Sequence, residues 1–351
     1  MVINTARASD KTVNLSPDAT VFFPTRWLIT GGCGFIGKNL IKQLVAEGGH
    51  FIRVLDNLSV GGREDLARIC KFVEVDQNAP EFSLADPCQL IVGDIRDPLV
   101  CIQAARDVDV IVHLAASTGV APSVENPRFD MESNVIGTVN VLEAARKNNL
   151  KRFVFASSGA PVGECQPPIH EELAPHPVSP YGASKLAGEG YCSAYYRSFG
   201  IDTVCLRFGN VYGPLSGHKE SVVARFIKQA MEGKLLEIYG NGQQTRDFIY
   251  IDDLIHAIRL SAAMKCVGGE IFQIATSAET TVNELAHILL SVLEEKGVSK
   301  VKMGHAAPRT GDVMRNFSDT SKAMRMLQWR ADTTLRMGIE YTVDWFLDFM
   351  S

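Results

Sequence analysis

The amino-acid sequence predicts an α/β protein in which a doubly wound parallel sheet is followed by a smaller C-terminal lobe. Apolar runs of strand length alternate with helical stretches up to about residue 206, and the rhythm changes after that point. The runs are rich in leucine and β-branched residues, which is typical of strands buried on both faces. Repeated strand–helix units of this kind predict a parallel sheet with helices on both sides.

The predicted strands are short apolar runs, at Trp27–Thr30, Phe51–Leu55, Gln89–Val92, Val108–Leu114, Arg152–Ala156 and Asp202–Leu206. Helical patterns lie between them, at Phe35–Ala46, Pro98–Arg106, Asn134–Lys147 and Pro180–Phe199. The segment Lys71–Pro87 carries two prolines and mixed polarity, which favours a surface loop.

The change of rhythm divides the chain into a sheet domain over residues 25–206 and a lobe over residues 207–351, with some segments of the latter returning to the sheet. Loops rich in Gly, Pro and Asn mark this lobe, at 209–217, 240–244 and 304–312. Residues 1–24 mix polar, small and charged residues without an apolar core, so we expect a loosely ordered tail and no secretory signal.

Composition excludes several classes of protein. The 351 residues are 46% hydrophobic and 21% charged, which excludes a disordered chain, and the net charge of −5 gives no basic footprint for nucleic acid. No apolar run is long enough to span a membrane. The eight cysteines lie at least 13 positions apart, so no CxxC pattern or metal site is predicted. Free cysteines in apolar patterns favour a reducing, cytoplasmic location.

A glycine-rich turn, TGGCGFIG at residues 30–37, lies between the first strand and the first helix. Its glycines allow backbone N–H groups to approach a pyrophosphate, and the following helix N-terminus favours the negative charge. Asp56 follows Gly37 by 19 positions, at the end of the next strand. A carboxylate there binds a ribose 2′-hydroxyl and repels a 2′-phosphate, so the pattern predicts NAD in preference to NADP.

Two further strand ends extend the predicted cofactor wall. Asp94 and Ile95 follow the third strand, where an adenine would lie, and small residues at 114–116 follow the fourth strand, where a dinucleotide would cross the sheet. His113 lies within that fourth strand and is predicted to be a packed core residue rather than a ligand.

Tyr181 and Lys185 begin the helix that follows Pro180 and lie four residues apart, on one helix face. A neighbouring ammonium and an oxidised nicotinamide lower the pKa of a phenol, which would make Tyr181 a general base near neutral pH. A Tyr-x-x-x-Lys spacing arises by chance in roughly one such chain in three. Its position after Ser157 and Ser158, which end the fifth strand, makes it informative.

Over residues 25–348 the chain resembles the extended short-chain dehydrogenase/reductases, specifically the NAD-dependent nucleotide-sugar epimerase/dehydratase family that includes UDP-glucose 4-epimerase. The resemblance rests on TGGCGFIG at 30–37, DNLSVGG at 56–62, GDIRD at 93–97, HLAA at 113–116, NVIGT at 134–138, SPYGASK at 179–185, LRFGNVYGP at 206–214 and YGNGQQTRDFIYIDDL at 239–254. The fold it implies is a Rossmann sheet with a C-terminal substrate-binding lobe.

The resemblance implies NAD as cofactor and three catalytic residues. Tyr181 would be the base and acid, Lys185 would hold the ribose hydroxyls, and Ser158 would bind the sugar oxygen that is oxidised. The implied cofactor-binding residues are Gly31, Gly34, Phe35, Ile36, Gly37, Asp56, Asn57, Ser59, Gly61, Asp94, Ile95, Leu114, Ala115, Ala116, Asn134, Tyr181, Lys185 and Phe208.

The resemblance also implies a nucleotide-sugar site. Its members would be Val120, Ser158, Gly159, Asn210, Arg246, Arg309, Asp312 and Asn316. Asn210 and Arg246 would contact the diphosphate, while Arg309 and Asp312 would face the nucleotide. Independently of the resemblance, a planar guanidinium binds phosphate in a bidentate manner.

The residues after Ser158 indicate which chemistry of the family to expect. Dehydratases of the group typically carry an Asp-Glu pair there and decarboxylases a Glu, whereas this chain has Gly159 and Ala160. That favours a 4-epimerase, which needs only oxidation and re-reduction at one carbon. The family's usual Val-Tyr-Gly is replaced by PVG at 161–163, and Asn316 stands where many galactose-type epimerases carry a bulky tyrosine. UDP-glucose/UDP-galactose and UDP-N-acetylhexosamine therefore both stay open.

The sequence leaves two alternatives to a 4-epimerase open. One is a nucleotide-sugar dehydratase or decarboxylase of the same family, and the other is a non-catalytic NAD-binding regulatory protein on the same fold. Retention of Ser158, Tyr181 and Lys185 disfavours the second alternative. The resemblance further implies a homodimer through the helices near 125–147 and 180–199, with no membrane or nucleic-acid partner.

Overall fold

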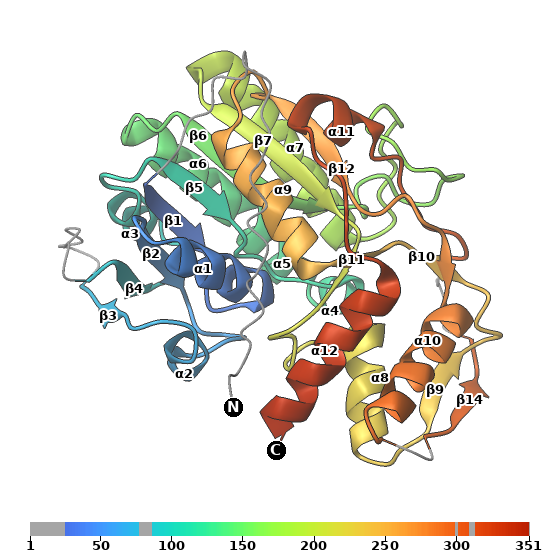
Figure 1. Ribbon diagram of the computed structural model, residues 1–351. Helices are drawn as coiled ribbons and strands as arrows, with labels where there is room; N and C mark the ends of the chain where they lie inside the picture. The colour runs from blue at the N-terminus through green and yellow to red at the C-terminus, as the bar shows by residue number, and fades with distance from the viewer. Residues whose placement is uncertain (1–24, 77–85, 299–300, 309–312, 351) are drawn as a thin grey trace.

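The computed structural model describes residues 25–76, 86–298, 301–308 and 313–350. The predicted N-terminal tail, residues 1–24, lies outside them. An eight-stranded sheet, in which every neighbouring pair is parallel, forms the centre of the molecule (Figure 1). Its order is β12 (Glu270–Ile274), β7 (Asp202–Phe208), β6 (Arg152–Ser158), β5 (Val110–His113), β1 (Arg26–Thr30), β2 (Phe51–Asp56), β4 (Cys88–Val92) and β3 (Val73–Glu74).

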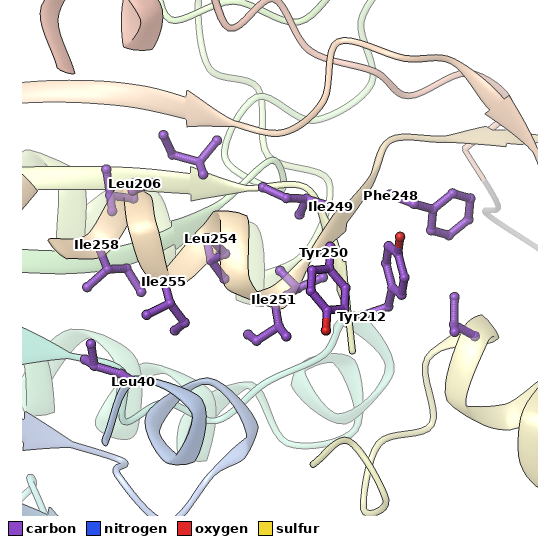
Figure 2. Packing of buried hydrophobic residues seen from close by; sticks show 14 of the residues in the cluster. Leu40, Leu206, Tyr212, Phe248, Ile249, Tyr250, Ile251, Leu254, Ile255 and Ile258 are labelled. Atoms are coloured by element: carbon purple, nitrogen blue, oxygen red, sulfur yellow. The ribbon is translucent and has the colours of Figure 1, made fainter. Parts of the chain in front are cut away.

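Helices cover both faces of this sheet, as the apolar strands require. One face packs on α1 (Phe35–Glu47) and α9 (Ile251–Ala263), and the other packs on α3 (Pro98–Ala104), α6 (Gly137–Lys147) and α7 (Pro180–Phe199). Figure 2 shows side chains of α9 facing Leu206 of β7 and Leu40 of α1. Burial of apolar surface on both faces is the main stabilising term for such a sheet.

The order of the strands reverses at β1, which has β2 on one side and β5 on the other. The chain leaves β1 into the glycine turn and leaves β5 into α4 (Val120–Glu125), α5 (Pro127–Met131) and a π-helical turn over Glu132–Ile136 that continues as α6. A crevice at such a reversal, at the carboxyl ends of the strands, is where open α/β sheets bind ligands.

The predicted doubly wound α/β fold is confirmed, and the six predicted strands match observed strands within a few residues. One expectation was wrong: the segment Lys71–Pro87 is not a loop throughout. Val73 and Glu74 form strand β3, which pairs with β4, and α2 (Arg63–Ala67) precedes it. A two-residue strand at a sheet edge is too short to leave a periodic pattern.

In its described residues, the C-terminal half contains three two-stranded sheets and, besides α9, four further helices. The sheets are β8 (Asn210–Tyr212) with β11 (Phe248–Tyr250), β9 (Leu236–Tyr239) with β14 (Met303–Ala306), and β10 (Thr245–Arg246) with β13 (Thr280–Thr281). The helices are α8 (Val222–Met231), α10 (Val282–Glu295), α11 (Ser321–Leu327) and α12 (Leu335–Met350). The predicted loops at 209–217 and 304–312 therefore contain strand residues, which corrects their assignment.

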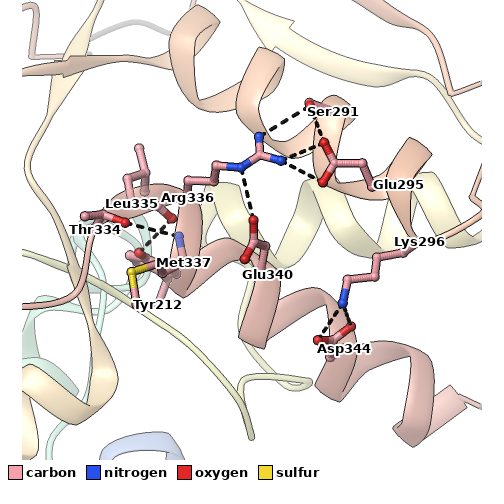
Figure 3. Close-up of polar contacts among 10 residues, drawn as sticks. All are labelled: Tyr212, Ser291, Glu295, Lys296, Thr334, Leu335, Arg336, Met337, Glu340 and Asp344. Carbon is pink, nitrogen blue, oxygen red and sulfur yellow. Dashed lines mark hydrogen bonds and ion pairs between the residues drawn. The ribbon is translucent and has the colours of Figure 1, made fainter.

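Helix α12 is joined to α10 by exposed ion pairs (Figure 3). Arg336 bonds Glu295 of α10 at 2.6 Å and Glu340 of its own helix at 3.0 Å, and Lys296 bonds Asp344 at 2.6 Å. Two elements of this half return to the main sheet, namely β12 at its edge and α9 on its face. Within the described residues, none of the helices has the length and apolar character that crossing a membrane requires.

Candidate active site

The glycine turn after β1 packs too tightly for other residues. Gly31 has a φ of +70°, and a Cβ there would lie 2.7 Å from the backbone nitrogen of Ala115. A Cβ on Gly37 would lie 2.5 Å from the Cα of Gly32. The turn is therefore held against the segment after β5, with the N-terminus of α1 next to it.

A cavity of about 690 Å³, here called the central cavity, lies at this turn, and its size is that of a small-molecule site. The carboxyl ends of β1, β2, β4, β5 and β6 all contribute to it. Most of the predicted site residues line it, namely Gly31, Gly34, Phe35, Ile36, Gly37, Asp56, Asn57, Ser59, Gly61, Asp94, Ile95, Leu114, Ala115, Ala116, Ser158, Tyr181, Lys185, Phe208 and Asn210.

Asp56 ends β2 at the edge of the central cavity. Its carboxylate accepts hydrogen bonds from the Cys33 amide at 2.9 Å and from the Leu58 amide at 2.8 Å. Burial raises the pKa of this carboxyl group, while the two amides oppose the shift. Asp94 is fixed nearby by Arg96 at 2.9 Å and Asn57 at 3.2 Å. Acceptors for ribose hydroxyls beside a glycine turn fit a dinucleotide, so the residues present fit NAD.

Helix α7 positions the predicted catalytic pair, Tyr181 and Lys185. Ser179 caps the helix by accepting from the Gly182 amide, and Pro180 takes the first helical position. Lys185 is buried, and its ammonium donates to the carbonyl of Ala156 at 2.9 Å. That ammonium lies 6.0 Å from the centroid of the Tyr181 ring.

Ser158, at the end of β6, lies near Tyr181, and its hydroxyl acts to lower the pKa of that phenol. Burial has the larger effect, however, and raises the pKa of Tyr181 above its ordinary value, with Asp130 adding to the increase. The expected lowering of this pKa by Lys185 is therefore wrong for the protein alone. Burial also lowers the pKa of Lys185, to about 8, which weakens its effect as a cation.

Asn134 supports the site without lining the cavity. The side-chain oxygen of Asn134 accepts from the backbone N–H of Ser117 at 2.8 Å, and its side-chain nitrogen donates to the Ser117 carbonyl at 2.9 Å. The same amide donates to Asp130 at 2.9 Å and to the Ser184 hydroxyl at 3.1 Å. It thus ties the segment after β5 to α7, one residue from Lys185.

Two buried acids near the catalytic helix were missed by sequence reasoning. Asp130 is buried near Lys185, and its Oδ2 atom has no hydrogen-bond partner among the residues that the structure describes. Glu189 accepts from the Ser157 hydroxyl at 2.6 Å and from Arg207 at 2.8 Å. Glu189 had a signal in the sequence, because it follows Lys185 by one helical turn on the same face. Asp130 had none.

A third buried acid organises loops of the C-terminal half of the chain. Asp247 accepts from the Thr276 amide at 2.7 Å, the Ser277 amide at 3.0 Å and the Ser318 amide at 3.2 Å. It therefore ties the loop after β12 and the segment at Ser318 to its own position, directly beside Arg246. Burial raises the pKa of Asp247, and the amide hydrogen bonds offset part of that increase.

The predicted substrate residues are only partly brought together. Asn210 lines the central cavity, whereas Val120, Gly159, Arg246 and Asn316 do not. Arg246 donates to the carbonyls of Thr245 and Val313, each at 2.7 Å. The backbone N–H of Asn316 donates to the Thr245 hydroxyl at 3.2 Å. Arg309 and Asp312 lie outside the described residues.

His113 is a packed core residue, as predicted. It bonds the Thr30 hydroxyl at 2.7 Å and the Thr138 hydroxyl at 3.1 Å, and it stacks on Phe155. Burial lowers its pKa to about 3, so the imidazole is neutral at physiological pH.

The fold and this site together define an NAD-binding enzyme built on a Rossmann sheet. A family model described as the NAD dependent epimerase/dehydratase family matches residues 27–275, and the chain belongs to that family. The resemblance inferred from the motifs and the predicted NAD cofactor are thereby confirmed.

The relatives include both epimerases and dehydratases. A putative UDP-glucose 4-epimerase from Methanocaldococcus jannaschii is 36% identical over 91% of this chain and 97% of that protein. A dTDP-glucose 4,6-dehydratase from Haemophilus influenzae is 30% identical over 91% of this chain and 97% of that protein. The solved UDP-glucose 4-epimerase of Thermotoga maritima, with UDP-glucose, has a TM-score of 0.82 and 33% identity, covering 93% of this chain and 100% of that one.

Proposed function

We propose that the protein is an NAD-dependent nucleotide-sugar 4-epimerase that acts on UDP-glucose/UDP-galactose or on a UDP-N-acetylhexosamine. The observation that carries this proposal is the distribution of acids in the central cavity. The carboxylates that line it are Asp56 and Asp94, at the ends of β2 and β4, and Glu220, which pairs with Lys228. No carboxylate lines it from the described segment between β6 and α7.

That distribution suits epimerisation and does not suit dehydration. Expelling water from a hexose requires an acid and a base beside the oxidised carbon, in addition to the tyrosine. Gly159 and Ala160 follow Ser158 and cannot transfer a proton through a side chain. A Cβ on Gly159 would meet no atom within 4 Å, so the place of a carboxylate is open space.

The catalytic residues have distinct roles in this mechanism. NAD, when bound, supplies the reversible hydride chemistry. Tyr181 takes the proton of the C4 hydroxyl and later returns it, and Ser158 hydrogen-bonds the same sugar oxygen. Lys185 is held by Ala156 near the tyrosine ring, where a ribose hydroxyl would receive its hydrogen bond. Inversion at C4 follows when the oxidised sugar turns over before re-reduction.

The second lobe would anchor the part of the substrate that does not react. Asn210 lines the central cavity, and we assign it to the diphosphate together with Arg246. Arg309 and Asp312 would bind the nucleotide. An anchored nucleotide with a mobile sugar suits a reaction in which only the sugar must rotate.

The identity of the sugar depends on the walls of the site. Asn316 does not line the central cavity, but asparagine is smaller than the tyrosine that many galactose-type epimerases carry at this position. We therefore keep UDP-N-acetylhexosamine beside UDP-hexose as a proposed substrate. Val162, which replaces the family's usual aromatic residue, is buried and does not line the central cavity. Val120 and Gly159 would lie at the periphery of the sugar site.

Product analysis tests this proposal. Purified protein is incubated with UDP-glucose and, separately, with UDP-N-acetylglucosamine, and the products are identified by NMR. We expect the C4 epimer without net formation of NADH. Loss of water or CO2 from the sugar would instead identify a dehydratase or decarboxylase, and no conversion of any nucleotide sugar would favour a non-catalytic NAD-binding protein.

We also propose a cytoplasmic homodimer. All eight cysteines are free thiols, which suits a reducing compartment. Helices α4 and α5 pack against α7, and these elements carry exposed apolar side chains, namely Val124, Phe129 and Tyr191. A second copy of the chain would cover them. Light scattering should give twice the monomer mass, and Val124→Glu should shift the protein toward the monomer; a monomeric wild type would contradict the proposal.

A further inference from the structure

The loop that leads from β8 into α8 brings a lysine of the second lobe to the cofactor turn. Lys219 lines the central cavity together with Gly31 and Gly34. Its ammonium lies 5.1 Å from the centroid of the Phe35 ring, and Phe35 is the first residue of α1. The second lobe therefore places a positive charge at the N-terminal end of the helix that follows the glycine turn.

Lys219 has no anionic partner within the part of the chain that the structure describes. The neighbouring acid, Glu220, pairs with Lys228 at 2.6 Å instead. Burial lowers the pKa of Lys219, and no carboxylate offsets that effect. A half-buried ammonium without a counter-charge is costly, and a bound anion would remove the cost.

The loop that carries Lys219 is anchored at several points. The Asn39 amide of α1 donates to the Pro214 carbonyl at 3.1 Å, and His218 contacts Asp65 at 3.3 Å. Lys228 donates to the carbonyl of Lys219 itself at 2.9 Å. The ammonium is therefore directed into the cavity by a fixed backbone, unlike that of a lysine on a solvated loop.

The surroundings of this ammonium suit a diphosphate. The first amides of α1 have no partner within the helix, and a helix N-terminus favours negative charge. The carboxylates Asp56 and Asp94 lie at the ends of other strands, where ribose and adenine are expected. Lys185, the other lysine of the cavity, donates to the Ala156 carbonyl on the catalytic side.

We propose that Lys219 binds the diphosphate of NAD, so that both lobes hold the cofactor. The glycine turn supplies backbone amides from the sheet domain, and the loop between β8 and α8 supplies the full positive charge. The inference concerns the cofactor alone and holds whichever nucleotide sugar the enzyme converts.

The test compares dinucleotide binding in Lys219→Met and wild-type protein by calorimetry, after removal of bound NAD. Methionine keeps the apolar contact with Phe35 and removes the charge. Loss of one charge-assisted hydrogen bond predicts about tenfold weaker binding of NAD and of ADP-ribose. Adenosine, which lacks the diphosphate, should bind equally to both proteins. Lys219→Arg should restore most of the affinity.

Lys234 provides the matched control, because it lies outside the cavity in an exposed ion pair with Glu232. Lys234→Met should bind NAD within about twofold of wild type. Unchanged NAD and ADP-ribose affinity in Lys219→Met would overturn the proposal. An equal loss of adenosine affinity would overturn it in favour of a structural role. UDP is titrated in the same way, and a loss confined to UDP would overturn the proposal by assigning Lys219 to the substrate's diphosphate.

Discussion

The buried ion pair beneath the catalytic helix gives a stability prediction that can be worked from the structure. Glu189 of α7 and Arg207 of β7 have side chains that are 2% and 3% exposed, and Arg207 donates two hydrogen bonds of 2.8 Å to Glu189. The same carboxylate accepts from Ser157 at 2.6 Å. Removing one partner of such a pair leaves a buried charge uncompensated, which costs about 3–5 kcal/mol.

We therefore expect Glu189→Gln to lower the free energy of unfolding by about 3 kcal/mol, measured by urea denaturation with circular dichroism at pH 7. In the double variant Glu189→Leu/Arg207→Met no charge is left unpaired. Its loss of unfolding free energy should therefore be well below the sum of the losses in the single variants Glu189→Leu and Arg207→Met. The control is Arg336→Met, which removes two exposed ion pairs, with Glu295 and Glu340, and should cost about 1 kcal/mol or less (Figure 3). A Glu189→Gln cost no larger than this control would refute the reasoning.

Three further predictions concern the active site. Tyr181→Phe should lower kcat by about 10³-fold while NAD binding stays within about twofold; near-normal turnover would remove Tyr181 from the role of base. Because burial raises the pKa of Tyr181, a near-ultraviolet titration of the NAD-free protein should show this phenol ionising above its ordinary pKa of about 10. Binding of NAD⁺ should move the transition to lower pH. A transition near neutral pH in the NAD-free protein would contradict this prediction. Gly37→Ala places a Cβ 2.5 Å from Gly32 and 2.6 Å from the Gly31 carbonyl, so NAD binding by calorimetry should be lost; unaltered affinity would show that the turn can relax.

Much of the fold could be predicted because buried parallel strands carry a strong local signal. Runs such as that of β2 are apolar throughout, and helices such as α7 begin with a recognisable Ser-Pro start. Strand β12 shows the limit. It joins the sheet by pairing Ile271 with Cys205, which lie 66 positions apart, and local periodicity carries no information on such pairing.

The cofactor half of the site could be predicted for a related reason. Its residues follow strands directly, and the carboxyl ends of parallel strands meet at one edge of the sheet. Backbone position alone therefore placed Asp56 and Asp94 in the central cavity. The pKa of Tyr181 could not be predicted in this way, because it depends on burial and on Asp130, which comes from a different helix.

The proposed substrate half of the site depends on loops of the C-terminal half of the chain and was harder to predict. A motif gives the residue type at Arg246 and not the direction of its side chain, which donates to the Val313 carbonyl. The approach of Lys219 to the cofactor turn depends on contacts of His218 with Asp65, 153 positions away in the chain. Such contacts are set by tertiary packing.

The central claim is that hydride leaves C4 of the sugar and returns to the same carbon from the opposite face. NMR of products formed from UDP-glucose or UDP-N-acetylglucosamine deuterated at C4 tests it most directly. The account predicts the C4 epimer with the deuterium still on C4 and no solvent hydrogen incorporated at C5. A product that has lost water and carries solvent hydrogen at C5 would contradict it.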